Sequence, residues 1–270
     1  MNKVIIETEK EIAFDSPDHI QPHGTKQDNS TNLAFNAKLR SWLSPESLRV
    51  MDVGCSGGGF VKSVLDEGDF AVGIEGSDYS KKNNRAEWAT IPESLFTTDA
   101  TADFQLLSES KEGTKTPIKF NVITAWEFIE HIKEEDLPNV MANFDKHLSA
   151  GGVIIISISP NEEVVNGITL HQCVHESEWW YAKFSELGYT NHEVAVKYFE
   201  NDMVRWDANA PGSFHVVLTR HAESIPNLSF LTGAIIHSLT ENQKALRKQL
   251  RLLGVLILII SIAAVLSSLL

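Results

Sequence analysis

The chain has 270 residues, of which 43% are hydrophobic and 22% charged, enough for one sizeable globular domain with an appendage. Its two cysteines, Cys55 and Cys173, exclude a disulfide framework and favour a reduced, intracellular compartment. The net charge of −13 argues against a nucleic-acid partner, because such a partner requires a large positively charged surface.

The chain begins with a polar segment, residues 1–30, that we predict to be an irregular N-terminal arm. Asn32–Leu43 follows with apolar residues at helical spacing. Apolar runs typical of strands then alternate with helical patterns as far as Arg220. The predicted strands are Leu48–Val53, Phe70–Ile74, Leu95–Thr98, Phe120–Ala125, Val153–Ile158, His192–Phe199 and Phe214–Thr219. The predicted helices are Phe60–Leu65, Tyr79–Trp88, Glu134–Leu148 and Ser177–Leu187.

This alternation predicts a doubly wound α/β fold. Strands that alternate with helices form a mostly parallel sheet, joined by right-handed crossovers and covered by helices on both faces. Val153–Ile158 is the most β-branched run, which is typical of a central strand buried on both faces.

A glycine-rich segment, residues 50–59, lies where the first strand meets its helix. Glycine permits the unusual φ angles of a tight turn, and the N-terminus of the next helix offers free N–H groups to an anionic ligand. In doubly wound sheets, ligands bind at the carboxyl ends of the strands. The segment therefore predicts a nucleotide site.

Acidic residues follow the next two predicted strands. Glu75, with Gly76 after it, comes about twenty residues past the turn, where a carboxylate accepts hydrogen bonds from both ribose hydroxyls. Asp99, followed by Ala100, is placed to accept a hydrogen bond from an adenine amino group. A nicotinamide dehydrogenase is the competing nucleotide-binding interpretation, but its G-x-G-x-x-G fingerprint has Ser56 at the middle glycine here.

The run Asp52-Val-Gly-Cys-Ser-Gly-Gly58 resembles motif I of the class I S-adenosylmethionine-dependent methyltransferases, often D-x-G-C-G-x-G. The resemblance covers roughly Leu33 to Arg220 and implies a Rossmann-like, seven-stranded sheet whose last strand is antiparallel. It also implies S-adenosyl-L-methionine as cofactor. Ser56 departs from the usual second glycine. The implied cofactor-binding residues are Asp52, Gly54, Cys55, Gly58, Glu75, Gly76, Asp99, Ala100 and Trp126.

The run Trp126-Glu-Phe-Ile-Glu-His131 follows the fourth strand, at the edge of the sheet where the methyl group would lie. We predict that His131 and Glu130 are catalytic, because an oxygen or nitrogen acceptor must lose a proton during transfer. The Glu-x-x-Glu-His pattern resembles the ubiquinone-pathway O-methyltransferases. It also resembles the small-RNA 2′-O-methyltransferases, where the run binds a divalent ion together with a later histidine.

That second resemblance implies a Mg²⁺ or Mn²⁺ site made by Glu127, Glu130, His131 and His171, with His175 as the alternative last ligand. Oxygen and imidazole ligands suit these ions, which lower the pKa of a hydroxyl group. The competing interpretation is that the acids only cap a helix, because glutamate is favoured near a helix N-terminus.

The C-terminal residues 252–270 contain no charged side chain, and Lys244, Arg247, Lys248 and Arg251 precede them. As a helix this segment would be about 28 Å long, close to the hydrocarbon thickness of a bilayer. It predicts a single-pass membrane anchor with the catalytic domain in the cytoplasm. A buried oligomerisation helix is the alternative.

Together these observations predict an arm (1–30), a methyltransferase domain (31–222), a linker with amphipathic and basic segments (223–251) and a transmembrane helix (252–270). The expected reaction is methyl transfer, most simply to oxygen, on a small-molecule or lipid-linked acceptor. The alternatives are a membrane-tethered, non-catalytic adaptor with the same fold and a nicotinamide-dependent oxidoreductase.

Overall fold

The computed structural model describes residues 2–43, 48–206 and 209–268. The chain divides into two units, Met1–Asn227 and Leu228–Leu270. Among the described residues, the first unit carries all the strands and most of the helices, and the described part of the second is one helix, α9 (Leu228–Ser268).

A seven-stranded sheet forms the centre of the first unit within the described residues, in the order β11-β12-β8-β7-β2-β3-β4. Neighbours from β8 to β4 are parallel, whereas β12 pairs antiparallel with both β8 and β11. The predicted mostly parallel sheet with an antiparallel last strand is confirmed. The strands are β2 (Arg49–Val53), β3 (Phe70–Glu75), β4 (Leu95–Thr97), β7 (Phe120–Trp126), β8 (Leu148–Ile158), β11 (Tyr189–Asn191) and β12 (Phe214–Arg220).

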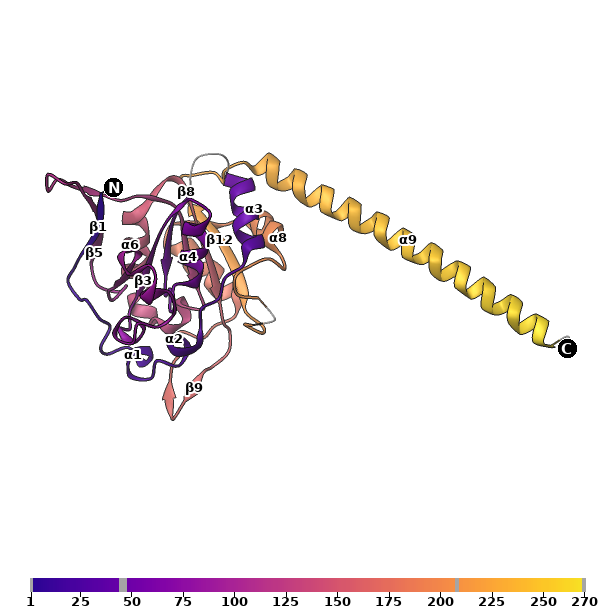
Figure 1. The fold of residues 1–270 in the computed structure, drawn as a ribbon, viewed down its shortest axis with the longest axis horizontal. Helices are drawn as coiled ribbons and strands as arrows, with labels where there is room; N and C mark the ends of the chain where they lie inside the picture. Colours follow the sequence, from indigo (N-terminus) through magenta and orange to yellow (C-terminus); the bar gives the residue numbers. More distant parts are fainter. Residues whose placement is uncertain (1, 44–47, 207–208, 269–270) are drawn as a thin grey trace. The chain divides into compact units, whose positions relative to one another are not determined.

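The core lies on the faces of this sheet. In β8, Val153, Ile154, Ile155 and Ile156 are fully buried, as expected for a β-branched run covered on both faces. Figure 1 shows the strands between α6 on one side and α3 with α8 on the other. The helices of this unit are α1 (Pro17–Ile20), α2 (His23–Gln27), α3 (Leu33–Leu43), α4 (Gly59–Asp66), α5 (Tyr79–Lys82), α6 (Leu137–His147), α7 (Ser177–Glu186) and α8 (Glu193–Phe199). Short 3-10 helices are η1 (Ala86–Ala89), η2 (Pro92–Ser94), η3 (Ile129–His131) and η4 (Glu134–Asp136).

The N-terminal segment is more ordered than its composition predicts. Besides α1 and α2 it contains β1 (Lys3–Thr8), which pairs antiparallel with β5 (Phe104–Glu109). A third strand, β6 (Lys115–Pro117), completes this small separate sheet. The partner of β1 lies about a hundred residues away, so local pattern alone gave no sign of the pairing.

Two predicted elements differ from the structure. His192–Phe199, predicted as a strand, is mainly the helix α8, because Ala195 and Phe199, four residues apart, are buried on one face. The single helix predicted for Tyr79–Trp88 is interrupted after Lys82, where Asn84 and Ala86 adopt positive φ angles that an α-helix cannot contain.

The helix α9 runs without a break across residue 252, the predicted start of the membrane span. Among the residues that the structure describes, no helix is both long and apolar enough to cross a bilayer. A span requires about twenty predominantly apolar residues, whereas the described part of α9 carries Glu241, Lys244, Arg247 and Lys248. The prediction of a transmembrane helix, and of a C-terminal anchor that holds the catalytic domain at a membrane, is therefore wrong.

His147, at the end of α6, is a buried neutral imidazole. Its Nε2 accepts a hydrogen bond from the Leu106 N–H at 3.0 Å, and its Nδ1 donates to the Asn143 carbonyl at 2.8 Å. The ring of Phe104 stacks on it at 4.8 Å between centroids. Burial is the largest influence on this group and lowers its pKa from 6.5 to about 4.

This lowered pKa predicts an acid-sensitive fold. The unfolded chain takes up a proton at His147 near pH 6.5, whereas the folded chain does so only near pH 4. The contribution of the neutral His147 ring to the free energy of unfolding is complete above pH 6.5. It is lost as the pH falls toward 4, which lowers the free energy of unfolding by up to about 3 kcal/mol. Urea unfolding across this pH range measures how steeply the free energy of unfolding depends on pH, and His147→Gln should make that dependence shallower. An equal slope in both proteins would contradict the assignment.

Candidate active site

A cavity of about 890 Å³ opens at the carboxyl ends of the central strands of the first unit. The N-terminal segment around α1 and α2 forms one wall, and the loop after β8 forms another. This is the sheet edge at which doubly wound folds bind ligands. Of the residues predicted from the sequence, those that line the cavity are Gly54, Glu75, Gly76, Asp99, Ala100, Trp126, Glu127, His131 and His171.

The glycine turn follows β2 directly. Gly54 has a φ of +78°, and a Cβ atom there would lie 2.9 Å from Cδ2 of Phe128. Gly58, with a φ of +86°, leaves equally little room beside Leu95. Both positions therefore require glycine on two grounds, the left-handed backbone and the close approach of a neighbouring side chain.

Three predicted cofactor residues, Asp52, Cys55 and Gly58, are absent from the described cavity wall and lie beneath it. Asp52 is 2% exposed and accepts a hydrogen bond from the Thr124 hydroxyl at 2.6 Å. Burial raises the pKa of its carboxyl to about 8. Asp52 belongs to β2, whereas Cys55 and Gly58 belong to the turn between β2 and α4.

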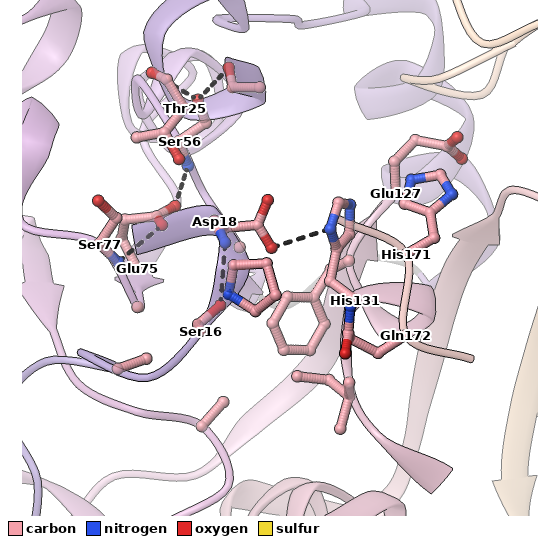
Figure 2. Close-up of a pocket in the computed structure, with 18 of the residues that line it drawn as sticks. Ser16, Asp18, Thr25, Ser56, Glu75, Ser77, Glu127, His131, His171 and Gln172 are labelled. Carbon is pink, nitrogen blue, oxygen red and sulfur yellow. Dashed lines mark hydrogen bonds and ion pairs between the residues drawn. The ribbon is translucent and has the colours of Figure 1, made fainter. Parts of the chain in front are cut away.

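Glu75, at the end of β3, is held by backbone groups on both of its oxygens. The Ser56 N–H donates to Oε2 at 2.8 Å, and the Ser77 N–H donates to Oε1 at 3.1 Å (Figure 2). Burial raises the pKa of this carboxyl, and the two backbone hydrogen bonds oppose the rise. A carboxylate fixed in this way, at the cavity wall, suits bidentate recognition of vicinal hydroxyls.

Asp99 lies beyond β4 and is already engaged on both oxygens. Its Oδ1 accepts hydrogen bonds from the backbone N–H and hydroxyl of Thr101, and its Oδ2 lies 3.0 Å from Nζ of Lys10. Burial raises the pKa of Asp99, but these hydrogen bonds outweigh it and leave the pKa below its usual value. Ala100 is next to it on the cavity wall.

At the opposite side of the cavity, Glu127 and η3 follow β7. Glu127 has a φ of +48°, its N–H donates to the Ser157 hydroxyl at 2.9 Å, and its Oε2 accepts from the Ser213 hydroxyl at 2.7 Å. A positive φ in a non-glycine residue is a costly conformation that is enriched at functional sites.

Glu130 is fully buried behind the cavity wall. Its Oε1 accepts a hydrogen bond from the Ser159 N–H at 2.8 Å. Its other carboxylate oxygen, Oε2, has no hydrogen-bond partner in the described part of the chain. Burial, and then the charge of Glu127, raise the pKa of Glu130 to about 7. An unpartnered buried carboxylate oxygen is costly unless something else binds it.

His131 carries an ion pair that the sequence did not predict. Its Nδ1 lies 2.8 Å from Oδ2 of Asp18 in α1 (Figure 2). Burial lowers the pKa of His131, but the charge and hydrogen bond of Asp18 outweigh it and raise the pKa to about 9. The edge of the His171 ring packs against it, with 4.5 Å between centroids, and Nε2 of His171 lies 3.2 Å from Oε2 of Glu163.

Within the residues that the structure describes, Glu130, His131 and His171 form a group that could hold a metal ion, because one ligand atom of each lies within 4.8 Å of the others. Glu127 and His175 do not belong to this group. The Glu127 carboxylate is turned to Ser213, and the ring of His175 stacks on Trp179 at 3.9 Å between centroids.

The sequence of the chain also matches a known family of proteins. A family model described as a methyltransferase domain matches residues 23–206, more than half of the chain. The chain belongs to this methyltransferase family. The match contains the glycine turn, both strand-end acids and the group of Glu130, His131 and His171.

The methyltransferase is also similar to individual proteins. It is 28% identical over 109 residues to a ubiquinone biosynthesis O-methyltransferase from Thiobacillus denitrificans, a match that spans 40% of the chain but only 43% of that relative. The structure of a DhpI–SAH complex matches 79% of the chain and 98% of its own, with a TM-score of 0.50 and 9% identity. The glycopeptide N-methyltransferase MtfA, complexed with S-adenosyl-L-homocysteine, covers 70% of the chain and 89% of its own, with a TM-score of 0.47 and 14% identity.

Family and fold together make the protein a class I S-adenosylmethionine-dependent methyltransferase. The nicotinamide-dependent oxidoreductase and the non-catalytic adaptor, the two alternatives considered from the sequence, are set aside by this result.

Ser56 stands in the methyltransferase where motif I usually has glycine, with a φ of +47°. Its hydroxyl oxygen lies 3.0 Å from the Asp28 carbonyl and accepts a hydrogen bond from Arg85 at 2.9 Å. The indole N–H of Trp88 donates to the Ser56 carbonyl at 2.8 Å. The serine thus connects the glycine turn to the N-terminal segment, which a glycine would leave unattached at this point.

Asp18 and Glu163 are the acidic neighbours of the two histidines that sequence reasoning missed. Asp18 belongs to a Ser-Pro-Asp run that reads only as a helix start, and Glu163 precedes a short hairpin of β9 (Val164–Val165) and β10 (Ile168–Thr169). Each acts on a residue far away or across a turn, so no local pattern could identify it.

Proposed function

We propose that the methyltransferase transfers a methyl group to a hydroxyl oxygen of a small-molecule acceptor, with a divalent cation, Mg²⁺ or Mn²⁺, held by Glu130, His131 and His171. One observation carries this proposal: the three side chains converge, and a buried oxygen of Glu130 is left without a partner. The name of the Thiobacillus denitrificans relative also supports an oxygen acceptor.

The donor set fits such an ion. One carboxylate and two imidazoles make a mixed oxygen and nitrogen site, which suits Mn²⁺ and is compatible with Mg²⁺. Glu127 stays a candidate fourth ligand, since its Oε1 is buried without a hydrogen bond in the described region. A bound divalent ion would lower the pKa of an acceptor hydroxyl.

The other side of the cavity fits the cofactor. S-adenosyl-L-methionine supplies an electrophilic methyl group on a sulfonium. Gly54 lines the cavity at the turn, Glu75 and Gly76 are placed for the ribose, and Asp99 with Ala100 for the adenine. Asp52, Cys55 and Gly58 support the turn from beneath. Trp126 lies between the two halves, and its indole N–H is buried without a partner in the described chain.

The remaining residues act by aligning the acceptor atom with the methyl group. Methyl transfer requires the acceptor atom to lie in line with the methyl group, so most of the catalytic effect comes from positioning. Glu130, whose pKa lies near 7, can take the acceptor proton, and His131, whose pKa lies near 9, can hold a proton at the reacting centre. Known ligand cavities span about 300 to 1,000 Å³. The cavity of about 890 Å³ therefore has room for an acceptor beside the cofactor.

A lipid-linked acceptor is the second candidate, because apolar side chains are exposed beside the cavity. Phe14 and Ile20 flank the lining residues of the N-terminal segment, and Val164 follows the lining residue Glu163, each with 58–59% exposure. An acceptor with a hydrocarbon chain could cover these side chains while its polar group entered the cavity. We expect no nucleic-acid acceptor, given the net charge of −13.

Label transfer tests the reaction. The purified protein would be incubated with S-adenosylmethionine carrying a labelled methyl group and with a metabolite extract and a lipid extract from cells that lack it. Methylation of an oxygen in a product, located by mass spectrometry, is expected. Label found only on nitrogen or carbon would refute the oxygen assignment, and label in the lipid extract alone would favour the second candidate.

Metal binding gives a separate prediction. We expect calorimetry with MnCl₂ to show one site in the wild-type protein, and Glu130→Gln or His171→Ala to weaken it by more than about 10-fold. His175→Ala, whose ring stacks on Trp179 instead, is the matched control and should bind Mn²⁺ like the wild type. Absence of Mn²⁺ binding in the wild-type protein, or equal affinity in all four proteins, would dispose of the metal site.

A further inference from the structure

The N-terminal helix α1 brings a carboxylate to the active site. Oδ2 of Asp18 lies 2.8 Å from Nδ1 of His131, across 113 positions of sequence. The two side chains are 25% and 15% exposed, so water screens this pair less than it screens an ion pair on the open surface. Figure 2 shows the carboxylate of Asp18 directed at the His131 ring.

The position of Asp18 is itself fixed by local structure. Ser16 caps α1 by accepting a hydrogen bond from the Asp18 N–H at 3.3 Å, and Pro17 occupies the first helical position. Proline presets the backbone angle that the first turn requires. The carboxylate therefore projects from a short but constrained turn rather than from an irregular arm.

The ring of His131 needs an external partner to hold its orientation. Besides Asp18, its ring contact is with the edge of His171. A carboxylate at Nδ1 holds the imidazole in one orientation, so that the other ring nitrogen, Nε2, points in a fixed direction. Histidines that bind metals almost always make such a hydrogen bond with the nitrogen that faces away from the ion.

We propose that Asp18 is a positioning residue, which holds the His131 imidazole through Nδ1 so that Nε2 is available to the reacting centre. This inference rests on the proposed function, in which His131 binds the divalent ion. It makes the N-terminal segment part of the active site. In this role Asp18 acts through the His131 ring.

The first test is spectroscopic and needs no metal or acceptor. Spectra of ¹⁵N-histidine-labelled wild-type protein should show a fixed Nδ1–H for His131, assigned by its loss in His131→Gln. The Nδ1–H signal of His131 should disappear in Asp18→Asn and should be retained in part in Asp18→Glu. The control is Glu11→Gln, because Glu11 is an exposed carboxylate of the same N-terminal segment and does not belong to the described cavity wall.

The second test measures Mn²⁺ affinity by calorimetry in the same proteins. We expect Asp18→Asn to weaken Mn²⁺ binding about 10- to 100-fold and Glu11→Gln to leave it unchanged. Binding of S-adenosylhomocysteine should be retained in both variants, which verifies that they fold. An Asp18→Asn protein with an unchanged His131 spectrum would overturn the inference. If the wild-type protein bound no Mn²⁺, the metal proposal would be refuted. The ¹⁵N-histidine spectrum of His131 alone would then decide the role of Asp18. If Asp18→Asn does not fold, Asp18→Glu carries both measurements.

Discussion

Replacing His131 by alanine is expected to lower turnover by about 10²- to 10⁴-fold, the usual contribution of a positioned acid or base. The imidazole is the part of the reacting centre that meets both Asp18 and His171. Label transfer to the acceptor identified in extracts measures the loss. The dissociation constant of S-adenosylhomocysteine should change little, because the residues placed for the cofactor lie at the ends of β2, β3 and β4.

His221→Ala is the matched control for that experiment. His221 lies outside the cavity wall as described and contacts Thr190 and the Ser185 carbonyl, so its loss should leave turnover at the wild-type level. Wild-type turnover in His131→Ala would remove this histidine from the mechanism. A parallel loss of cofactor affinity would instead indicate that the substitution had disturbed the whole cavity.

Replacing Glu75 by alanine is expected to weaken S-adenosylhomocysteine binding roughly 100-fold. Hydrogen bonds to a charged group contribute about 1.5–3 kcal/mol, and about 1.4 kcal/mol corresponds to a tenfold change in affinity. The substitution also leaves the N–H groups of Ser56 and Ser77 without their acceptor. Calorimetric titration with S-adenosylhomocysteine measures the change, since this compound needs no acceptor to bind.

Two further variants separate the contributions of Glu75. Glu75→Gln retains one carbonyl oxygen as an acceptor and should lose less affinity than the alanine variant. Glu93→Ala removes an exposed carboxylate from η2 and should bind like the wild type. If Glu75→Ala bound S-adenosylhomocysteine with the wild-type constant, the ribose assignment would have to be abandoned.

The central sheet and the location of the glycine turn, Glu75 and Asp99 at the cavity were predictable from sequence because all of them depend on local signals. A buried strand needs a continuous apolar run, and a tight turn at positive φ needs glycine, as at Gly54. Glu75 and Asp99 could be placed because parallel strands end at the same edge of a sheet. Each of these rules connects residues that are close in sequence to a geometry that the backbone fixes.

The features that were missed depend on partners distant in sequence. The strand β1 exists through its pairing with β5, and Asp18 reaches His131 only in the folded chain. In α8 the spacing of the apolar residues fits both the two-residue period of a strand and the 3.6-residue period of a helix. Burial against β12 selects the helix. For α9, the apolar composition of its end suggested a membrane span that the structure does not bear out.

Under the proposed function, the pairing of β2 with β7 sets the separation between methyl donor and acceptor. Val53 lies opposite Ala125, so the glycine turn and the segment that begins at Trp126 leave the sheet at the same level. A slip of two residues would displace one relative to the other by about 6.6 Å, whereas a displacement of about 1 Å already costs on the order of 100-fold in rate. Catalysis therefore constrains interior residues that contact no ligand, and a substitution that only loosens this pair of strands would act as an active-site mutation.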